Sequence, residues 1–208
     1  TSMLDQIKTI RKDQMVVTDV ASTKAQICDY AKRTWPQPLQ FIGSHPIAGS
    51  EKYGPENASS DLYEGSVVIV ESMQDWHKPE AYNLVCKFWT FLGAIVHQLD
   101  PPEHDIILAR TSHVPHIAAA GLALLADIGK NVRPMLGGGF RDTTRIAAGS
   151  PAMWRDICLT NSEAIGSALN AYADKLKKAA EWIAARDPDS LERFFQDARD
   201  SRKRLLEE

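Results

Sequence analysis

The chain has 208 residues, enough to bury the core of one or two domains. Its net charge of -3 and its pI of about 6.1 exclude the broadly basic surface that binds nucleic acid. No apolar run approaches the roughly 20 residues of a membrane span, and the start of the sequence lacks the pattern of a signal peptide. We therefore expect neither nucleic acid nor a membrane among the partners of the chain.

Strand-type and helix-type patterns alternate over the first hundred residues. Apolar residues at helical spacing predict a helix over 3–12, and a β-branched run predicts a buried parallel strand over 15–20. The elements that follow are a helix over 22–33, a strand over 39–42, a polar loop over 49–65, a strand over 67–70, a helix over 79–92 and a strand over 94–99. This alternation predicts a parallel, doubly wound, Rossmann-like sheet.

The pattern changes at Asp100-Pro101-Pro102, beyond which every periodic run is helical. Long helical patterns cover 103–128, 151–184 and 188–206, and Asp187-Pro188 separates the last two. We therefore predict an α/β plus all-α chain. Residues 1–100 should form part of a Rossmann-like domain, and residues 101–208 should form an all-helical domain. The family resemblance given below implies that the first is the C-terminal part of a nucleotide-binding domain and that the second serves substrate binding and dimerisation.

A dinucleotide-binding domain opens with a strand, a G-x-G-x-x-G turn and a helix. No such turn precedes the strand at 15–20, and the glycines at 137–139 follow no predicted strand. If these residues belong to a dinucleotide-binding domain, as the family resemblance given below implies, its N-terminal, phosphate-binding half is missing from this chain. The chain should then bind a dinucleotide poorly by itself. Truncation, cleavage of the N-terminus and a split gene would all give a sequence of this kind.

The three cysteines, Cys28, Cys86 and Cys158, lie far apart on segments with apolar periodicity. Their odd number and wide spacing favour reduced, buried thiols and show no metal-ligand spacing. Such thiols are typical of a cytoplasmic protein.

The segment 41–51, Phe-Ile-Gly-Ser-His-Pro-Ile-Ala-Gly-Ser-Glu, carries the most informative residue. An apolar run ends at Gly43, and His45 follows it, with Pro46 keeping the chain out of a helix. Open α/β sheets bind ligands at strand ends, and a histidine there can accept a proton at neutral pH. The alternative is a histidine with a purely structural role in a turn.

Ser22 follows the strand at 15–20, where its hydroxyl could face the same crevice or cap the helix that we expect to start at 23–24. His104, His113 and His116 form a second group of polar residues, which raises the alternative of a metal site. Pro115 and the absence of an H-E-x-x-H pattern argue against a metal, and we predict none.

Four segments, taken in order, resemble the prephenate/arogenate dehydrogenase family of tyrosine biosynthesis. They are Asp-Val-Ala-Ser-Thr-Lys at 19–24, the segment 41–51, Thr-Ser-His-Val-Pro-His at 111–116, and Gly-Gly-Gly-Phe-Arg-Asp-Thr-Thr-Arg-Ile-Ala at 137–147. The resemblance runs from about residue 15 to about residue 161. It implies an enzyme that oxidises and decarboxylates prephenate or arogenate with NAD or NADP, and a homodimer built through the helical domain.

The resemblance also implies roles for single residues. His45 would be the catalytic base, Ser22 would lie beside it and the nicotinamide, and Arg145 would bind a substrate carboxylate. The remaining implied contacts are Asp19 with the cofactor, and His116, His104, Ser50, Glu51 and Asp142 with the substrate or Arg145. Trp154 is expected in the core. Ala21 and Thr23 depart from the glycine and valine usual in the family, which leaves the fine positioning of the cofactor open.

Two other functions stay open at this point. The chain could be a binding or regulatory module that has lost its cofactor half, or a related dehydrogenase of the 3-hydroxyacid or 6-phosphogluconate type. A G-x-G-x-x-G segment encoded just upstream of Thr1 would favour the enzyme. Helix 103–128 is apolar around most of its circumference, and a monomer could bury such a helix within its own domain. The small residues at 118–121 suit the close approach of another helix and favour the predicted homodimer.

Overall fold

The computed structural model describes residues 2–10, 12, 14–48 and 57–206. By its internal contacts the chain divides into two compact units, Thr1–Ile165 and Gly166–Glu208. The predicted domain boundary near residue 101 lies inside the first unit and stays a prediction. Among the described residues, no helix combines the length and the apolar character that crossing a membrane requires.

In the described part of the chain, five short strands build the sheet region of the first unit. β1 (Val17–Thr18) pairs in parallel with β2 (Phe41–Ile42), while β3 (Ser44–Ile47), β4 (Val67–Glu71) and β5 (Ile95–Leu99) form a second ladder in that order. β4 and β5 are parallel, but β3 is antiparallel to β4. The chain passes from one ladder to the other at Gly43.

The antiparallel strand β3 corrects one prediction. We expected the strand to end before His45, yet His45 lies inside β3 and pairs with Ile69. Pro46 pairs with Val68 in the same strand. Proline is tolerated because β3 lies at the edge of its ladder, where a missing N–H breaks no bond to a further strand.

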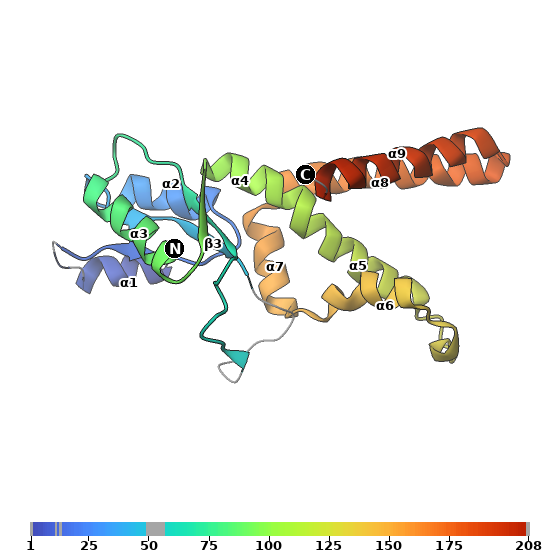
Figure 1. Ribbon diagram of the computed structural model, residues 1–208, viewed down its shortest axis with the longest axis horizontal. Coiled ribbons are helices and arrows are strands. Elements are labelled where there is room, and N and C mark those ends of the chain that lie inside the picture. The colour runs from blue at the N-terminus through green and yellow to red at the C-terminus, as the bar shows by residue number, and fades with distance from the viewer. Residues whose placement is uncertain (1, 11, 13, 49–56, 207–208) are drawn as a thin grey trace. The chain divides into compact units, whose positions relative to one another are not determined.

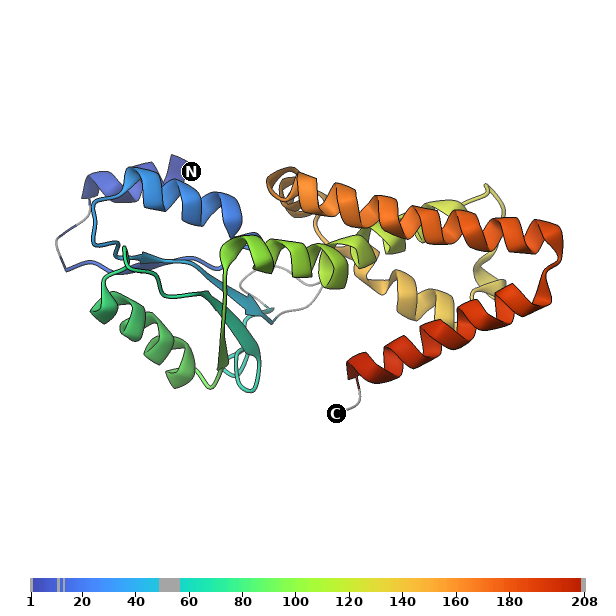
Figure 2. The ribbon, with the colours of Figure 1, turned by 90° about the horizontal axis from the view of Figure 1, so that it is seen from above.

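Helices cover both faces of the strands. α1 (Ser2–Ile10) and α2 (Ala25–Thr34) lie on one face, and α3 (Pro79–Phe91) lies on the other (Figure 2). Phe41 and Ile42 are neighbours in β2 and point to opposite faces, because side chains alternate along a strand. One core therefore holds Leu4, Cys28, Ala31, Trp35, Leu39 and Phe41, and the other holds Ile42, Val68, Val70, Ala81, Tyr82, Val85, Trp89 and Ala94. The predicted fold class is confirmed.

The predicted helix over 103–128 has a change of winding in its middle. α4 (Pro101–Leu108) continues through a π-helical turn, η2 (Ala109–His113), into α5 (Val114–Ala126) (Figure 1). Pro115 has no N–H to donate to the preceding turn, and the wider π turn makes room for its ring. Turns of this kind often occur at functional sites.

Shorter helices complete the first unit: η3 (Arg133–Met135), α6 (Gly138–Thr144), η4 (Arg145–Ala148), α7 (Pro151–Thr160) and the start of α8 (Ser162–Ala185). The pattern over 151–184 had predicted one helix, but Asn161 separates α7 from α8. The second unit holds the rest of α8 and α9 (Pro188–Leu206), joined by Arg186 with a φ of 52°. Asp187 accepts the Ser190 N–H at 3.1 Å and so caps α9, at the break predicted from Asp187-Pro188.

Candidate active site

His45 contacts a second, fully buried histidine. Its Nδ1 lies 2.8 Å from Nε2 of His104 on α4, with the two rings edge to face at 62°. The Nδ1 of His104 lies 2.8 Å from Oδ1 of Asp105. Three ring nitrogens of the two histidines and one carboxylate thus form a chain of hydrogen bonds from β3 into α4.

The Asp105 carboxylate sets the direction of these hydrogen bonds. Burial raises the pKa of Asp105, but hydrogen bonds from His104 and from the Lys24 and Ala25 amides outweigh it, and the pKa lies below its ordinary value. The ionised carboxylate can only accept, so His104 donates from Nδ1 and accepts at Nε2 from the Nδ1–H of His45. The Nε2 of His45 therefore keeps its lone pair and can take a proton.

The surroundings of His45 favour its neutral form. Burial, with smaller contributions from His104, Lys24 and His113, lowers the pKa of His45 to about 3, against a small opposing effect of Asp105. At neutral pH the imidazole is thus uncharged and able to act as a base.

Asp105 also holds the start of α2. Its Oδ1 accepts the Lys24 N–H at 2.8 Å and its Oδ2 accepts the Ala25 N–H at 2.9 Å. The suggested role of Ser22 as helix cap is wrong, because α2 begins at Ala25 and this carboxylate from α4 occupies its first amides. Ser22 lies half-buried in the bend between β1 and α2.

Asp19 ties that bend to the residue before His45. Its Oδ1 accepts the Ser44 N–H at 2.9 Å, its Oδ2 accepts the Ala21 N–H at 3.0 Å, and it forms a buried ion pair with Lys24. Both carboxylate oxygens thus bind protein donors. The predicted contact of Asp19 with a cofactor stays a prediction.

His113 is a buried structural residue in this arrangement. Asn161 donates from Nδ2 to the Asp105 carbonyl at 2.8 Å and lies 3.3 Å from Nδ1 of His113. Burial lowers the pKa of His113 to about 4, against an opposing effect of Asp105. In the part of the chain that the structure describes, no group of three or more histidine, cysteine or acidic residues could hold a metal ion.

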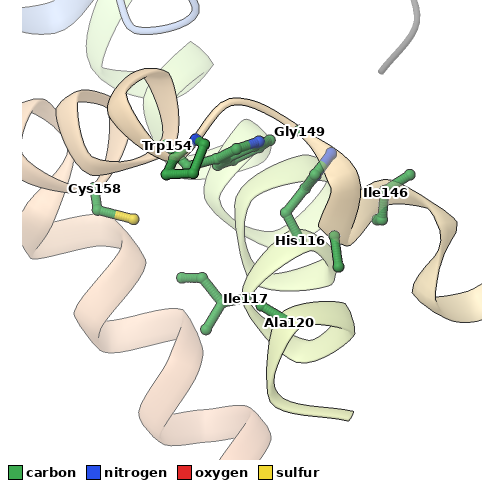
Figure 3. Close-up of a pocket in the computed structure, with 9 residues that line it drawn as sticks. His116, Ile117, Ala120, Ile146, Gly149, Trp154 and Cys158 are labelled. Atoms are coloured by element: carbon green, nitrogen blue, oxygen red, sulfur yellow. The ribbon is translucent and has the colours of Figure 1, made fainter. Parts of the chain in front are cut away.

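His116 belongs to a separate group of residues around an apolar pocket of about 240 Å³. Its ring stacks on that of Trp154 with centroids 3.8 Å apart, and its Nδ1 donates to the Ser112 carbonyl at 2.9 Å. Trp154, expected in the core, is instead half-buried at this pocket. Figure 3 shows side chains from α5 on one side of the pocket and from α7 on the other. Its lining comprises His116, Ile117, Ala120, Ile146, Ala147, Gly149, Pro151, Trp154 and Cys158.

Arg145 is exposed and begins η4, directly before the pocket residue Ile146. Asp142 is exposed on α6, three residues earlier. Ser50 and Glu51 lie outside the described residues. The contacts thus unite His45, His104 and Asp105 in one group and His116 with the pocket in another. The convergence of His45, Ser22 and Arg145 on one cleft stays a prediction.

Two family models match this chain over most of its length. The model for the nucleotide-binding domain of prephenate dehydrogenase matches residues 1–98, and the model for its dimerization domain matches residues 100–197. The chain belongs to the prephenate dehydrogenase family. The resemblance inferred from the four sequence segments is thereby confirmed.

Individual members of the prephenate dehydrogenase family give the same result. Prephenate dehydrogenase of Bacillus subtilis is 36% identical over 196 residues, which are 92% of this chain and 53% of the relative. Cyclohexadienyl dehydrogenase of Zymomonas mobilis is 32% identical over 200 residues, covering 93% of this chain and 67% of that protein. The chain therefore spans about half of the Bacillus relative and two thirds of the other.

A crystal structure from the same family shares the fold. Prephenate dehydrogenase from Aquifex aeolicus, in complex with hydroxyphenyl propionate and NAD+, is 30% identical with a TM-score of 0.85. The match covers 98% of this chain and 72% of that one.

Proposed function

We propose that this chain acts in the oxidative decarboxylation of prephenate or arogenate with NAD or NADP. Family membership supports the reaction, and the hydrogen-bonded chain from Asp105 through His104 to His45 is the observation that carries it. That chain leaves Nε2 of His45 as a proton acceptor of fixed orientation, which oxidation of an alcohol requires.

The reaction consists of one proton transfer, one hydride transfer and the loss of carbon dioxide. Nε2 of His45 accepts the proton of the ring 4-hydroxyl as a carbonyl forms at that carbon. Bound NAD or NADP takes up the hydride from the same carbon. The bond to the carboxylate across the ring then breaks, its electron pair makes the ring aromatic, and carbon dioxide leaves. The ionised Asp105 offsets part of the positive charge that His45 gains.

The residues after β1 suit the nicotinamide end of the cofactor. This strand end is where parallel sheets bind dinucleotides, and Ser22 offers a half-buried hydroxyl there. The first amides of α2 already bind Asp105, so they do not suit a pyrophosphate. We therefore assign Ser22 to the nicotinamide, with Asp19 holding the bend in place.

For the substrate, we assign Arg145 to a carboxylate and His116 to the wall of the site. The Nδ1–H of His116 is donated to the Ser112 carbonyl, so its Nε2 is the nitrogen left for a hydroxyl or amino donor. Asp142 and Glu51 would orient Arg145, Ser50 would line the pocket, and His104 acts through His45. We place the reaction in the cytoplasm, in keeping with free thiols at all three cysteines.

The test is turnover by the purified natural protein. Prephenate and arogenate are each supplied with NAD or NADP, and nicotinamide reduction is followed by absorbance. We expect reduction with at least one of the four combinations. Binding of a substrate without any reduction would instead favour the regulatory-module alternative.

A further inference from the structure

Glu71, the last residue of β4, holds the residue at which the chain passes from β2 to β3. Its Oε1 accepts the Gly43 N–H at 2.6 Å, and its own N–H donates to the Gly43 carbonyl at 2.9 Å. Glu71 is only 5% exposed, so both hydrogen bonds are protected from water. One buried residue thus fixes both backbone polar groups of Gly43, two positions before His45.

Packing at Gly43 is too tight for a side chain. A Cβ there would lie 2.5 Å from Sγ of Cys28 on α2 and 3.4 Å from Oε1 of Glu71. Real Cβ atoms do not approach another atom as closely as the first distance. Because residue 43 is glycine, α2 and β4 can both pack tightly against the backbone where the chain passes from β2 to β3.

The second oxygen of Glu71 faces a buried histidine. His77 accepts the Gln74 N–H at Nδ1, 2.9 Å away, so its own proton lies on Nε2, which is 3.5 Å from Oε2 of Glu71. The thiol of Cys28 is a further neighbour. Its pKa is raised by burial and then by Glu71. The reaction described above uses neither Glu71, His77 nor Cys28.

We infer that Glu71 is a positioning residue for His45. It fixes Gly43, while Asp19 and Thr18 fix Ser44 through its N–H at 2.9 Å and its hydroxyl at 2.8 Å. The two residues before His45 therefore have little freedom, and the direction of its Cα–Cβ bond toward His104 follows from them. The inference deepens the proposed function and rests on it for its kinetic part only.

Without this anchor, the crossover at Gly43 would relax and the imidazole of His45 would move away from His104 into water. The groups that set its protonation are His104, Asp105, Lys24 and His113. A more hydrated His45 protonates more easily, because burial is the main reason that its neutral form is favoured. Substrate affinity would change little, since the proposed carboxylate ligand lies on η4.

The first test needs no turnover. In the intact protein labelled at histidine Cε1, NMR follows the pH titration of His45, assigned with His45→Gln. We expect Glu71→Leu, which has no acceptor for the Gly43 N–H, to move the midpoint of His45 upward, toward the value of about 6.5 of an unperturbed histidine. A folded Glu71→Leu protein with an unchanged midpoint would overturn the inference, whether or not the protein is an active dehydrogenase.

A second pair of variants tests the same anchor if Glu71→Leu does not fold. Gly43→Ala should move the His45 midpoint upward too, and adding Cys28→Ala, which removes the close sulfur, should restore it. Gly166→Ala, at a helical glycine whose Cβ would meet nothing within 4 Å, is the control. Failure of Cys28→Ala to reverse a shift caused by Gly43→Ala would contradict the inference.

Kinetics give the third readout in an active enzyme. We expect Glu71→Leu to lower kcat about tenfold and to leave KM within about twofold, because a misplaced base slows the chemical step without weakening binding. A loss confined to KM would overturn the inference. Inactivity of the unmodified protein would count against the proposed function alone and leave the NMR test to decide on Glu71.

Discussion

His45 is available as a base because of its two neighbours and its burial. Asp105 forces His104 to donate from Nδ1, and His104 in turn forces the proton of His45 onto Nδ1. Burial then favours the uncharged ring. Tautomer, orientation and protonation state are thus all set by the protein before a substrate arrives.

The first prediction concerns the pH dependence of turnover. Because the pKa of His45 is lowered to about 3, the base form persists far into the acid range, and kcat/KM should not fall through the ordinary histidine range. His104→Gln removes a neighbour that lowers this pKa, so the acid limb of the profile should move to higher pH. The exposed His97, changed to Gln, is the control. An acid limb near pH ~6.5 in the unmodified enzyme would contradict the lowered pKa of His45.

Sequence alone predicted His45, because a strand-type run, a glycine and a proline are local signals. It did not predict Asp105, whose role depends on amides that lie 81 and 80 positions away along the chain. Asn161 and Glu71 were not predicted, for the same reason. Their partners lie far away along the chain, so no spacing in the sequence indicates these contacts.

At the scale of elements, α2 depends on a residue outside itself. It has no side-chain cap of its own, and Asp105 on α4 occupies its first two amides. This contact joins the sheet region to the helix that carries His104. Loss of one carboxylate would therefore disturb the start of α2 and the hydrogen bond to His104 together.

The second prediction follows from this contact. Asp105→Ala should lower the free energy of unfolding by about 1–3 kcal/mol, because it leaves buried donors without an acceptor. Amide hydrogen exchange should also rise in the first turn of α2. Asp29→Ala, on the exposed side of the same helix, removes only a surface pair with Arg33 and should cost less than about 1 kcal/mol. Equal effects of the two substitutions would refute the capping role.

Element boundaries were predictable where the signal was local. Asp187-Pro188 marks the start of α9 because aspartate caps and proline suits a first turn. The sequence did not predict β3, because the pairing of Ser44 with Val70 is a long-range contact that no local sequence signal indicates. The π turn before Pro115 was missed because helical periodicity over 103–128 barely changes when one turn widens.

At the scale of the whole molecule, the segment from the end of α5 to η3 carries large apolar side chains that are exposed. The exposed fractions are 77% for Leu124, 74% for Leu125, 62% for Ile128 and 74% for Met135. Large apolar side chains with this much exposure favour contact with another chain. They lie in the region that matches the dimerization domain of the family. We propose a second copy of this protein as the partner.

The third prediction is a homodimer at micromolar concentration, with an interface above about 1,200 Å² in total. Leu124→Glu combined with Leu125→Glu should yield the mass of a monomer in light scattering, because charges would be buried without partners. Leu84→Glu, at an exposed leucine of α3, should leave the dimer intact. A monomer mass for the unmodified protein would contradict the proposal.

The central claim is that His45 accepts the proton in a reaction that joins oxidation to decarboxylation. The direct measurement supplies prephenate labelled in its ring carboxylate, with NAD or NADP, and follows nicotinamide reduction and labelled carbon dioxide together. We expect one of each per turnover, and a joint fall of about 10²–10⁴-fold in His45→Gln. A His45→Gln enzyme that keeps its full rate, or carbon dioxide released without nicotinamide reduction, would contradict the account.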